Sequence, residues 1–129
     1  MAGERVLLVD DEEMLRNVAG RMLRKLGYVV QEFSNGADAV KYYREHWRDI
    51  DLVVLDMVMP DMSGAVTFDK LKEISPKVKV LLSSGYSIDG QATEILNRGC
   101  NGFIQKPFNL RKLSQKLREI LDEPDAPSP

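Results

Sequence analysis

The sequence predicts an α/β fold in which helices cover both faces of one parallel sheet of five strands. Two observations lead to this prediction. Five short apolar runs alternate with longer segments in which apolar residues recur at helical spacing. The runs at 6–9 and 52–55 are apolar throughout, as is typical of strands buried on both faces of a parallel sheet. Right-handed crossovers between such strands give a doubly wound sheet, for which we expect the strand order 2-1-3-4-5.

Local signals place the elements of the first half. A strand at 6–9 is followed by a helix at 11–26, which Gly27 ends. The apolar face of this helix is predicted to consist of Leu15, Val18, Met22 and Leu26, and its solvated basic face of Arg16, Arg21, Arg24 and Lys25. The strand at 28–33 is more polar than its neighbours, which favours the edge of the sheet. Ser34-Asn35-Gly36 supplies a turn and a cap for a helix at 37–47.

The second half repeats the pattern after the strand at 52–55. In chain order we expect a helix at 63–74 after Pro60, a strand at 78–83, a glycine-bracketed loop at 85–90, a helix at 91–97, a strand at 103–105 and a last helix capped by Asn109. The buried stripe of that last helix is predicted to be Leu110, Leu113, Leu117 and Leu121.

Composition limits the function classes. The 129 residues suit one domain, predicted to span 1–122, with a proline-rich acidic tail or linker start at 123–129. A net charge of −2 gives no electrostatic reason to expect binding to nucleic acid or to an anionic membrane. No apolar run approaches the roughly 20 residues of a membrane span. The single Cys100 cannot form an internal disulfide, which favours the cytoplasm.

Acidic residues follow the two most apolar strands. Asp10 and Asp11 come directly after the run at 6–9, and Asp56 follows the run at 52–55. In the predicted strand order these strands are neighbours, so their carboxyl ends bring the three acids together. Three adjacent carboxylates repel one another unless protons or a cation neutralise them. The sequence therefore predicts a divalent-metal site with one carboxylate left free to react.

Two further residues complete this predicted site. Ser83-Ser84 marks the end of the fourth strand and Lys106 that of the fifth, which puts Ser84 and Lys106 at the same edge of the sheet as the acids. Carboxylates, a hydroxyl and an ammonium together suit phosphoryl transfer, in which a carboxylate can attack phosphorus and become an aspartyl phosphate. Mg²⁺ is the expected ion because it prefers hard oxygen ligands, and Mn²⁺ is the alternative.

Four segments carry a resemblance to a known family. They are Val9-Asp10-Asp11-Glu12, Leu55-Asp56-Met57-Val58-Met59-Pro60-Asp61-Met62-Ser63-Gly64, Leu81-Leu82-Ser83-Ser84-Gly85-Tyr86 and Lys106-Pro107-Phe108. In this order and at this spacing they resemble the receiver domains of two-component response regulators, the CheY-like superfamily, over about 5–121. The resemblance implies a three-layer, flavodoxin-like (βα)₅ fold.

The resemblance also implies a role for each site residue. Asp56 would be the phosphoacceptor for a phosphohistidine of a sensor histidine kinase or a histidine phosphotransfer domain. The implied metal ligands are Asp11, Asp56, the backbone carbonyl of Val58 and, through water, Asp10. Lys106 would pair with the phosphoryl oxygens, Ser84 and Phe103 would be the switch residues, and the Lys106–Pro107 bond would be cis.

Two surfaces follow from the same resemblance. The first helix would dock the histidine-bearing partner. The fourth helix, fifth strand and fifth helix would form the output or homodimer surface. Such a domain is a phosphoacceptor that catalyses its own phosphotransfer and dephosphorylation, and not a conventional enzyme.

The chain departs from the commonest family pattern at a few positions. Phe103 stands where Tyr is frequent, so readout through a tyrosine hydroxyl is ruled out. Val58 and Tyr86 cannot position a hydrolytic water as a carboxylate or amide would. We therefore hypothesise that they shield the aspartyl phosphate and slow its hydrolysis.

Other functions stay open at this point. An aspartyl-nucleophile phosphatase usually needs a second Asp two residues after the nucleophile, where this chain has Val58. A nucleotide-binding switch would need a G-x-x-x-x-G-K-[ST] loop, which is missing from the sequence. A phosphorylation-independent interaction module would be expected to lack some of the five site residues. Both a stand-alone regulator and the receiver of a hybrid sensor histidine kinase fit the chain, and the segments around Ser84 and Lys106 favour the hybrid kinase.

Overall fold

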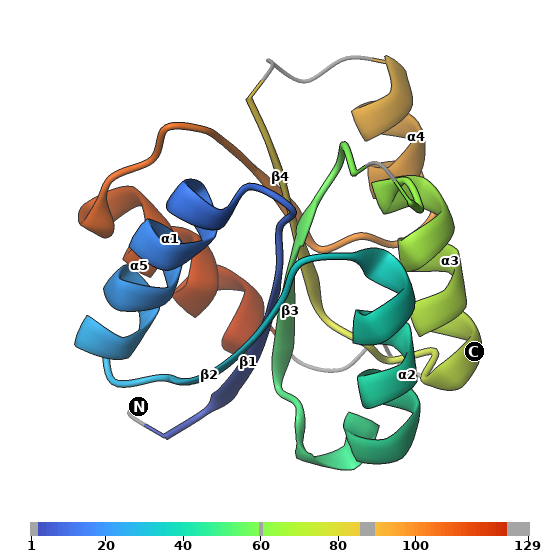
Figure 1. Ribbon diagram of the computed structural model, residues 1–129, viewed down its shortest axis with the longest axis horizontal. Coiled ribbons are helices and arrows are strands. Elements are labelled where there is room, and N and C mark those ends of the chain that lie inside the picture. Colours follow the sequence, from blue (N-terminus) through green and yellow to red (C-terminus); the bar gives the residue numbers. More distant parts are fainter. Residues whose placement is uncertain (1–2, 60, 86–89, 124–129) are drawn as a thin grey trace.

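The computed structural model describes residues 3–59, 61–85 and 90–123. Within them, a five-stranded parallel sheet in the order β2-β1-β3-β4-β5 lies between two layers of helices. Figure 1 shows α1 and α5 on one face of the sheet and α2, α3 and α4 on the other. The predicted fold class and strand order are confirmed.

The elements follow the predicted alternation with small shifts at their ends. The strands are β1 (Arg5–Val9), β2 (Val29–Phe33), β3 (Leu52–Asp56), β4 (Val80–Ser84) and β5 (Gly102–Gln105). The helices are α1 (Glu13–Lys25), α2 (Gly36–His46), the 3₁₀ turn η1 (Trp47–Asp49), α3 (Gly64–Ile74), α4 (Gly90–Asn97) and α5 (Leu110–Leu121).

The helix ends use the chemistry that the sequence indicates. Asn35 caps α2 by accepting a hydrogen bond from Asp38 N at 2.8 Å, and Asn109 caps α5 by accepting one from Lys112 N at 2.8 Å. Gly27 has φ = 98°, a left-handed conformation that glycine adopts without a steric penalty, and it ends α1 as predicted. The predictions for Pro60 and for most of the loop at 85–90 lie outside the described residues.

The core has two halves because successive strand side chains point to opposite faces of the sheet. Leu7 and Val53 pack under α2, α3 and α4, whereas Leu8 and Val54 pack under α1 and α5. In the described part of the chain no helix combines the length and the apolar character that a membrane crossing needs.

The predicted apolar face of α1 is confirmed in part. Met22 and Leu26 are half-buried and pack against the core, and Leu15 is half-buried. Ala19 and Leu23 are buried against the sheet, whereas Val18 is 44% exposed. The buried positions of α1 are thus Ala19, Gly20 and Leu23. The predicted solvated face is also wrong for Arg16, whose side chain is 16% exposed and pairs with Glu32.

The buried stripe of α5 differs at its ends. Leu113 and Leu117 are fully buried as predicted, and Ile120 takes the third buried position. Leu110 and Leu121 are only half-buried because they lie on the margins of the face that Ile120 completes.

Candidate functional site

Three carboxylates meet at the carboxyl edge of the sheet. Asp10 follows β1 and Asp56 ends β3, and these two strands pair in parallel. One oxygen from each of Asp10, Asp11 and Asp56 lies within 4.8 Å of the others. Asp10 and Asp56 are each 4% exposed, and Asp11 is half-buried. The predicted meeting of the acids is thus present.

Lys106 reaches the same cluster from the end of β5. Its Nζ lies 2.8 Å from Asp10 Oδ2 and 3.3 Å from Asp56 Oδ1, and its side chain is 9% exposed. The backbone N–H of Lys106 donates to the carbonyl of Ser84 at 2.7 Å, which joins the ends of β4 and β5. The Lys106–Pro107 bond is cis, as predicted.

Within the described ranges, the carboxylates of this cluster outnumber the ammonium groups that pair with them. Burial raises the pKa of Asp56 to about 7; the Lys106 ammonium opposes this rise and the Asp10 carboxylate adds to it. Burial alone would lower the pKa of Lys106, but its hydrogen bond to Asp10 and the charge of Asp56 raise it. Above the pKa of Asp56, the three ionised carboxylates and the ammonium of Lys106 sum to two negative charges, which match a divalent cation. Because the donors are hard oxygens, the residues fit Mg²⁺.

An open cleft of about 490 Å³ gives access to the acids. Asp11, Asp56 and Lys106 line it together with Val58. Reactive groups that line one solvent-accessible cleft can contact a substrate, so the arrangement suits a group-transfer reaction at Asp56.

Comparison with known proteins decides the family. The sequence model described as "Response regulator receiver domain" matches residues 6–118. The chain belongs to the response regulator receiver family. Its acidic pocket of Asp10, Asp11 and Asp56 is typical of the phosphoacceptor site of this family, whose members are signalling modules and not conventional enzymes.

Individual relatives of this receiver include both sensor kinases and single-domain regulators. It is 36% identical to the sensor kinase CckA of Brucella abortus over 93% of this chain, which is only 13% of that protein. It is 32% identical to the chemotaxis protein CheY of Bacillus subtilis, with 92% of this chain and 98% of CheY covered.

A solved receiver structure has the same fold. It is the receiver domain of the sensor histidine kinase PA1611 of Pseudomonas aeruginosa, with a magnesium ion coordinated in its active-site cleft. The TM-score is 0.85 at 26% identity, and the match covers 95% of this chain and all of the other. The acidic triad of this receiver is therefore like that of a magnesium-binding receiver.

The predicted switch residues lie where the sequence suggested. Ser84 ends β4 at the site edge and is 1% exposed. Phe103 lies on β5, half-buried against the core on the α4 side of the sheet. Their roles as switches stay predictions.

The residues of the shielding hypothesis are only partly described. The side chain of Val58 is 56% exposed and lines the cleft, and its backbone N–H lies 3.5 Å from Asp56 Oδ1. Tyr86 lies outside the described residues.

Asp61 has a structural role that sequence reasoning missed. Its Oδ1 accepts a hydrogen bond from Gly36 N at 3.3 Å, and its Oδ2 accepts one from Ala37 N at 3.2 Å. These are backbone donors of the first turn of α2, which have no partner within the helix. Asp61 thus ties the loop that follows Asp56 to a helix 25 residues earlier, and no local spacing indicates such a contact.

Proposed function

We propose that this receiver is a phosphoacceptor in a two-component phosphorelay, and that Asp56 takes a phosphoryl group from the phosphohistidine of a partner protein. The observation that carries the proposal is the unbalanced acidic cluster beside an open cleft. Among the described residues, Lys106 supplies the one ammonium that pairs with the cluster of Asp10, Asp11 and Asp56, through Asp10 and Asp56. A divalent cation and the phosphoryl group would complete this site.

The metal ligands would be Asp11, Asp56 and the carbonyl of Val58. Asp10 would act through water, because its Oδ1 already accepts from Glu12 N at 3.0 Å and its Oδ2 pairs with Lys106. When bound, Mg²⁺, or Mn²⁺ in its place, would neutralise charge on the phosphoryl oxygens.

The reaction would be one displacement at phosphorus. An oxygen of Asp56 forms the new O–P bond while the P–N bond to the partner's imidazole breaks, and the imidazole nitrogen keeps that electron pair. Lys106 lies 3.3 Å from Asp56 and can pair with the transferred group, while Ser84 would donate a hydrogen bond from its hydroxyl.

The partner would approach over α1. Met14 is 79% exposed and Val18 is 44% exposed, so α1 presents apolar side chains to solvent near the cleft, which Leu15 of the same helix also lines. Exposed apolar side chains grouped beside a reactive site favour protein docking. A sensor histidine kinase or a histidine phosphotransfer domain fits this surface.

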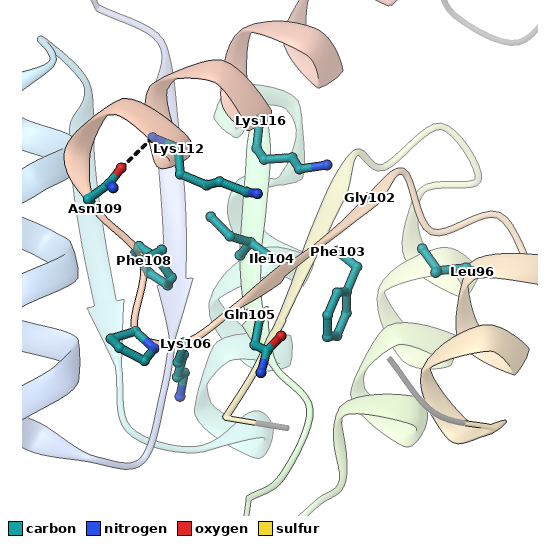
Figure 2. Close-up of a pocket in the computed structure, with 11 residues that line it drawn as sticks. Leu96, Gly102, Phe103, Ile104, Gln105, Lys106, Phe108, Asn109, Lys112 and Lys116 are labelled. Carbon is teal, nitrogen blue, oxygen red and sulfur yellow. Dashed lines mark hydrogen bonds between the residues drawn. The ribbon is translucent and has the colours of Figure 1, made fainter. Parts of the chain in front are cut away.

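Phosphorylation would be read at the surface formed by α4, β5 and α5. A groove of about 770 Å³ runs along it (Figure 2). In Figure 2, Lys112 and Lys116 extend from α5 on one side, Leu96 of α4 lies on the other, and Phe103 lies between them. A change in the burial of Phe103 would alter this groove and its affinity for a partner or for a second copy of the chain.

The larger context is part of the proposal. The similarity to CckA favours a hybrid sensor histidine kinase as the parent protein, and the full-length match to CheY supports the stand-alone alternative. The domain would work in the cytoplasm. An aspartyl-nucleophile phosphatase gains no support, because Val58 offers only a hydrocarbon side chain where such enzymes use an acid.

Phosphoramidate tests the proposed chemistry, because it carries the P–N bond of a phosphohistidine in a small molecule. We expect labelling of the protein with Mg²⁺, no labelling with a chelator, and loss of the label in hydroxylamine, which cleaves acyl phosphates. A label that resists hydroxylamine, or that forms equally well without metal, would contradict the proposal.

A further inference from the structure

Arg16 connects the edge strand of the sheet to the acid pair. Its Nη1 donates a hydrogen bond to the backbone carbonyl of Asp10 at 2.9 Å, and its Nε lies 3.5 Å from Glu32 Oε1 on β2. The Arg16 and Glu32 side chains are 16% and 21% exposed. One guanidinium therefore joins α1, β2 and the residue that follows β1, directly beside the predicted metal site.

The hydrogen bond from Arg16 is one of four contacts that hold Asp10 in place. The Asp10 N–H donates to the carbonyl of Phe33 at 3.1 Å, Oδ1 accepts from Glu12 N, and Oδ2 pairs with Lys106. The carbonyl that Arg16 holds belongs to the peptide group that leads into Asp11. A hydrogen bond from a charged donor is stronger than one between neutral groups, so Arg16 fixes the plane of this peptide and the direction in which Asp11 leaves it.

Glu32 keeps Arg16 in this position. The carboxylate of Glu32 also pairs with Arg24, at 2.8 Å from Nη1, and so lies between two guanidinium groups. Because Glu32 offsets its charge, Arg16 can bind a carbonyl near the acids without acting as a free counter-ion for them.

Gly20 gives independent support for this cluster. It lies inside α1, where glycine is less favourable than alanine. A Cβ at this position would lie 2.7 Å from Glu32 Oε2 and 3.2 Å from Arg24 Nη1. The glycine thus leaves the space that the Glu32 carboxylate occupies.

We propose that Arg16, held by Glu32, is a positioning residue for the divalent-cation site and acts through the peptide between Asp10 and Asp11. This inference rests on the proposed function, because the cation is the one that the phosphoacceptor site would bind.

The sign of the effect separates positioning from simple electrostatics. Loss of a positive charge close to carboxylates should strengthen cation binding if Arg16 acted only through its charge. Loss of a positioning contact should weaken it, and such supporting contacts typically change metal affinity by about tenfold or more. The two accounts therefore predict opposite changes.

The test is a calorimetric Mg²⁺ titration of the wild type, Arg16→Met and Arg21→Met. Arg21 is an exposed arginine of the same helix, so its substitution removes the same charge without touching Asp10. We expect Arg16→Met to weaken Mg²⁺ binding about tenfold, and Arg21→Met to leave it within about twofold of the wild type because Arg21 is solvent-exposed. Binding by Arg16→Met as tight as that of the wild type, or tighter, overturns the inference.

Glu32→Gln provides a second variant should Arg16→Met fail to fold. It removes the group that holds the guanidinium, and we expect Mg²⁺ binding to weaken severalfold. Unchanged affinity in Glu32→Gln overturns the inference. The wild-type titration distinguishes failure of the proposed function from failure of the inference about Arg16. If the wild type shows no saturable Mg²⁺ binding, the proposed function itself loses its basis. If the wild type binds Mg²⁺ and the variants bind it equally well, only the role of Arg16 is overturned.

Discussion

Lys106 Nζ lies 2.8 Å from Asp10 Oδ2, closer than its 3.3 Å separation from Asp56 Oδ1. The ammonium is thus shared between an acid that supports the site and the acid proposed to react. A phosphoryl group on Asp56 would compete with Asp10 for it. Lys106 is therefore expected both to hold the metal-free cluster together and to respond to phosphorylation.

Replacement of Lys106 by Met should separate these two effects. The variant leaves the carboxylates without their buried counter-charge. At pH 8 without metal we therefore expect a loss of about 3 kcal/mol in the free energy of unfolding, at the low end for a buried pair because the cleft is open to water. Mg²⁺ should bind more tightly and restore much of the stability, because a competing cation is gone. Urea denaturation with and without Mg²⁺ measures both. Equal stability of the variant and the wild type without metal would contradict the shared-ammonium description.

The raised pKa of Asp56 predicts a pH dependence of the metal-free protein. In the unfolded chain Asp56 ionises near its ordinary pKa of 3.8, whereas in the folded chain it holds its proton up to about pH 7. Protonation of Asp56 therefore favours the folded state at low pH, and the contribution of Asp56 to the free energy of unfolding falls as the pH rises from about 4 to about 7. Above about pH 7, Asp56 is ionised in both states, and the folded state carries the full free-energy cost of a buried carboxylate.

Asp56→Asn should remove this penalty. At pH 8 without metal we expect the variant to be more stable than the wild type by about 1–2 kcal/mol, less than the full shift implies because the cleft is open to water. The difference should disappear at pH 4, and saturating Mg²⁺ should reduce it. Parallel stability profiles of the two proteins between pH 4 and pH 8 would show that Asp56 is not strained by its surroundings.

The contact of Asp61 with α2 predicts a modest structural effect. Asp61→Ala should lower the free energy of unfolding by about 0.5–2 kcal/mol, because two backbone donors at the start of α2 lose their acceptor. Asp61→Asn keeps one acceptor oxygen and should lose less. Chemical denaturation of the two variants measures the difference, and a harmless Asp61→Ala would mean that water replaces the carboxylate.

Val58 should influence the lifetime of the phosphorylated form. Val58→Asn would place an amide at the cleft where it can orient an attacking water, so we expect dephosphorylation to accelerate severalfold. The decay of the labelled protein after removal of the donor measures this rate, with Val58→Ile as a control that keeps the position apolar. Equal lifetimes for Val58→Asn and the wild type would count against shielding by this residue.

The sequence predicted the sheet and the acidic cluster well for a shared physical reason. Fully apolar runs such as 52–55 are typical of central strands, and a polar run such as 28–33 suits the edge. In the strand order predicted from these runs, the strands that precede Asp10 and Asp56 are neighbours. Their carboxyl ends therefore bring Asp10 and Asp56 together. Lys106 is positioned by the same argument.

Contacts that depend on how the helices and strands pack against one another could not be predicted from the sequence in this way. On α1, Met22 and Leu26 pack against the core as predicted, but hydrophobic periodicity identified neither the burial of Ala19 nor the exposure of Val18. Arg16 looks like an ordinary surface arginine in the sequence, and its bond to Asp10 depends on how α1 crosses β2. Asp61 likewise caps a helix that local sequence does not connect to it.

The most direct test of the phosphoacceptor assignment is the intact mass of the protein after incubation with acetyl phosphate. Wild type with Mg²⁺ should gain the mass of a single phosphoryl group, and the gain should be absent without metal and absent in Asp56→Asn. Under conditions that label a known receiver, no adduct on the wild type, or an adduct that persists in Asp56→Asn, would contradict the assignment of Asp56 as the phosphoacceptor.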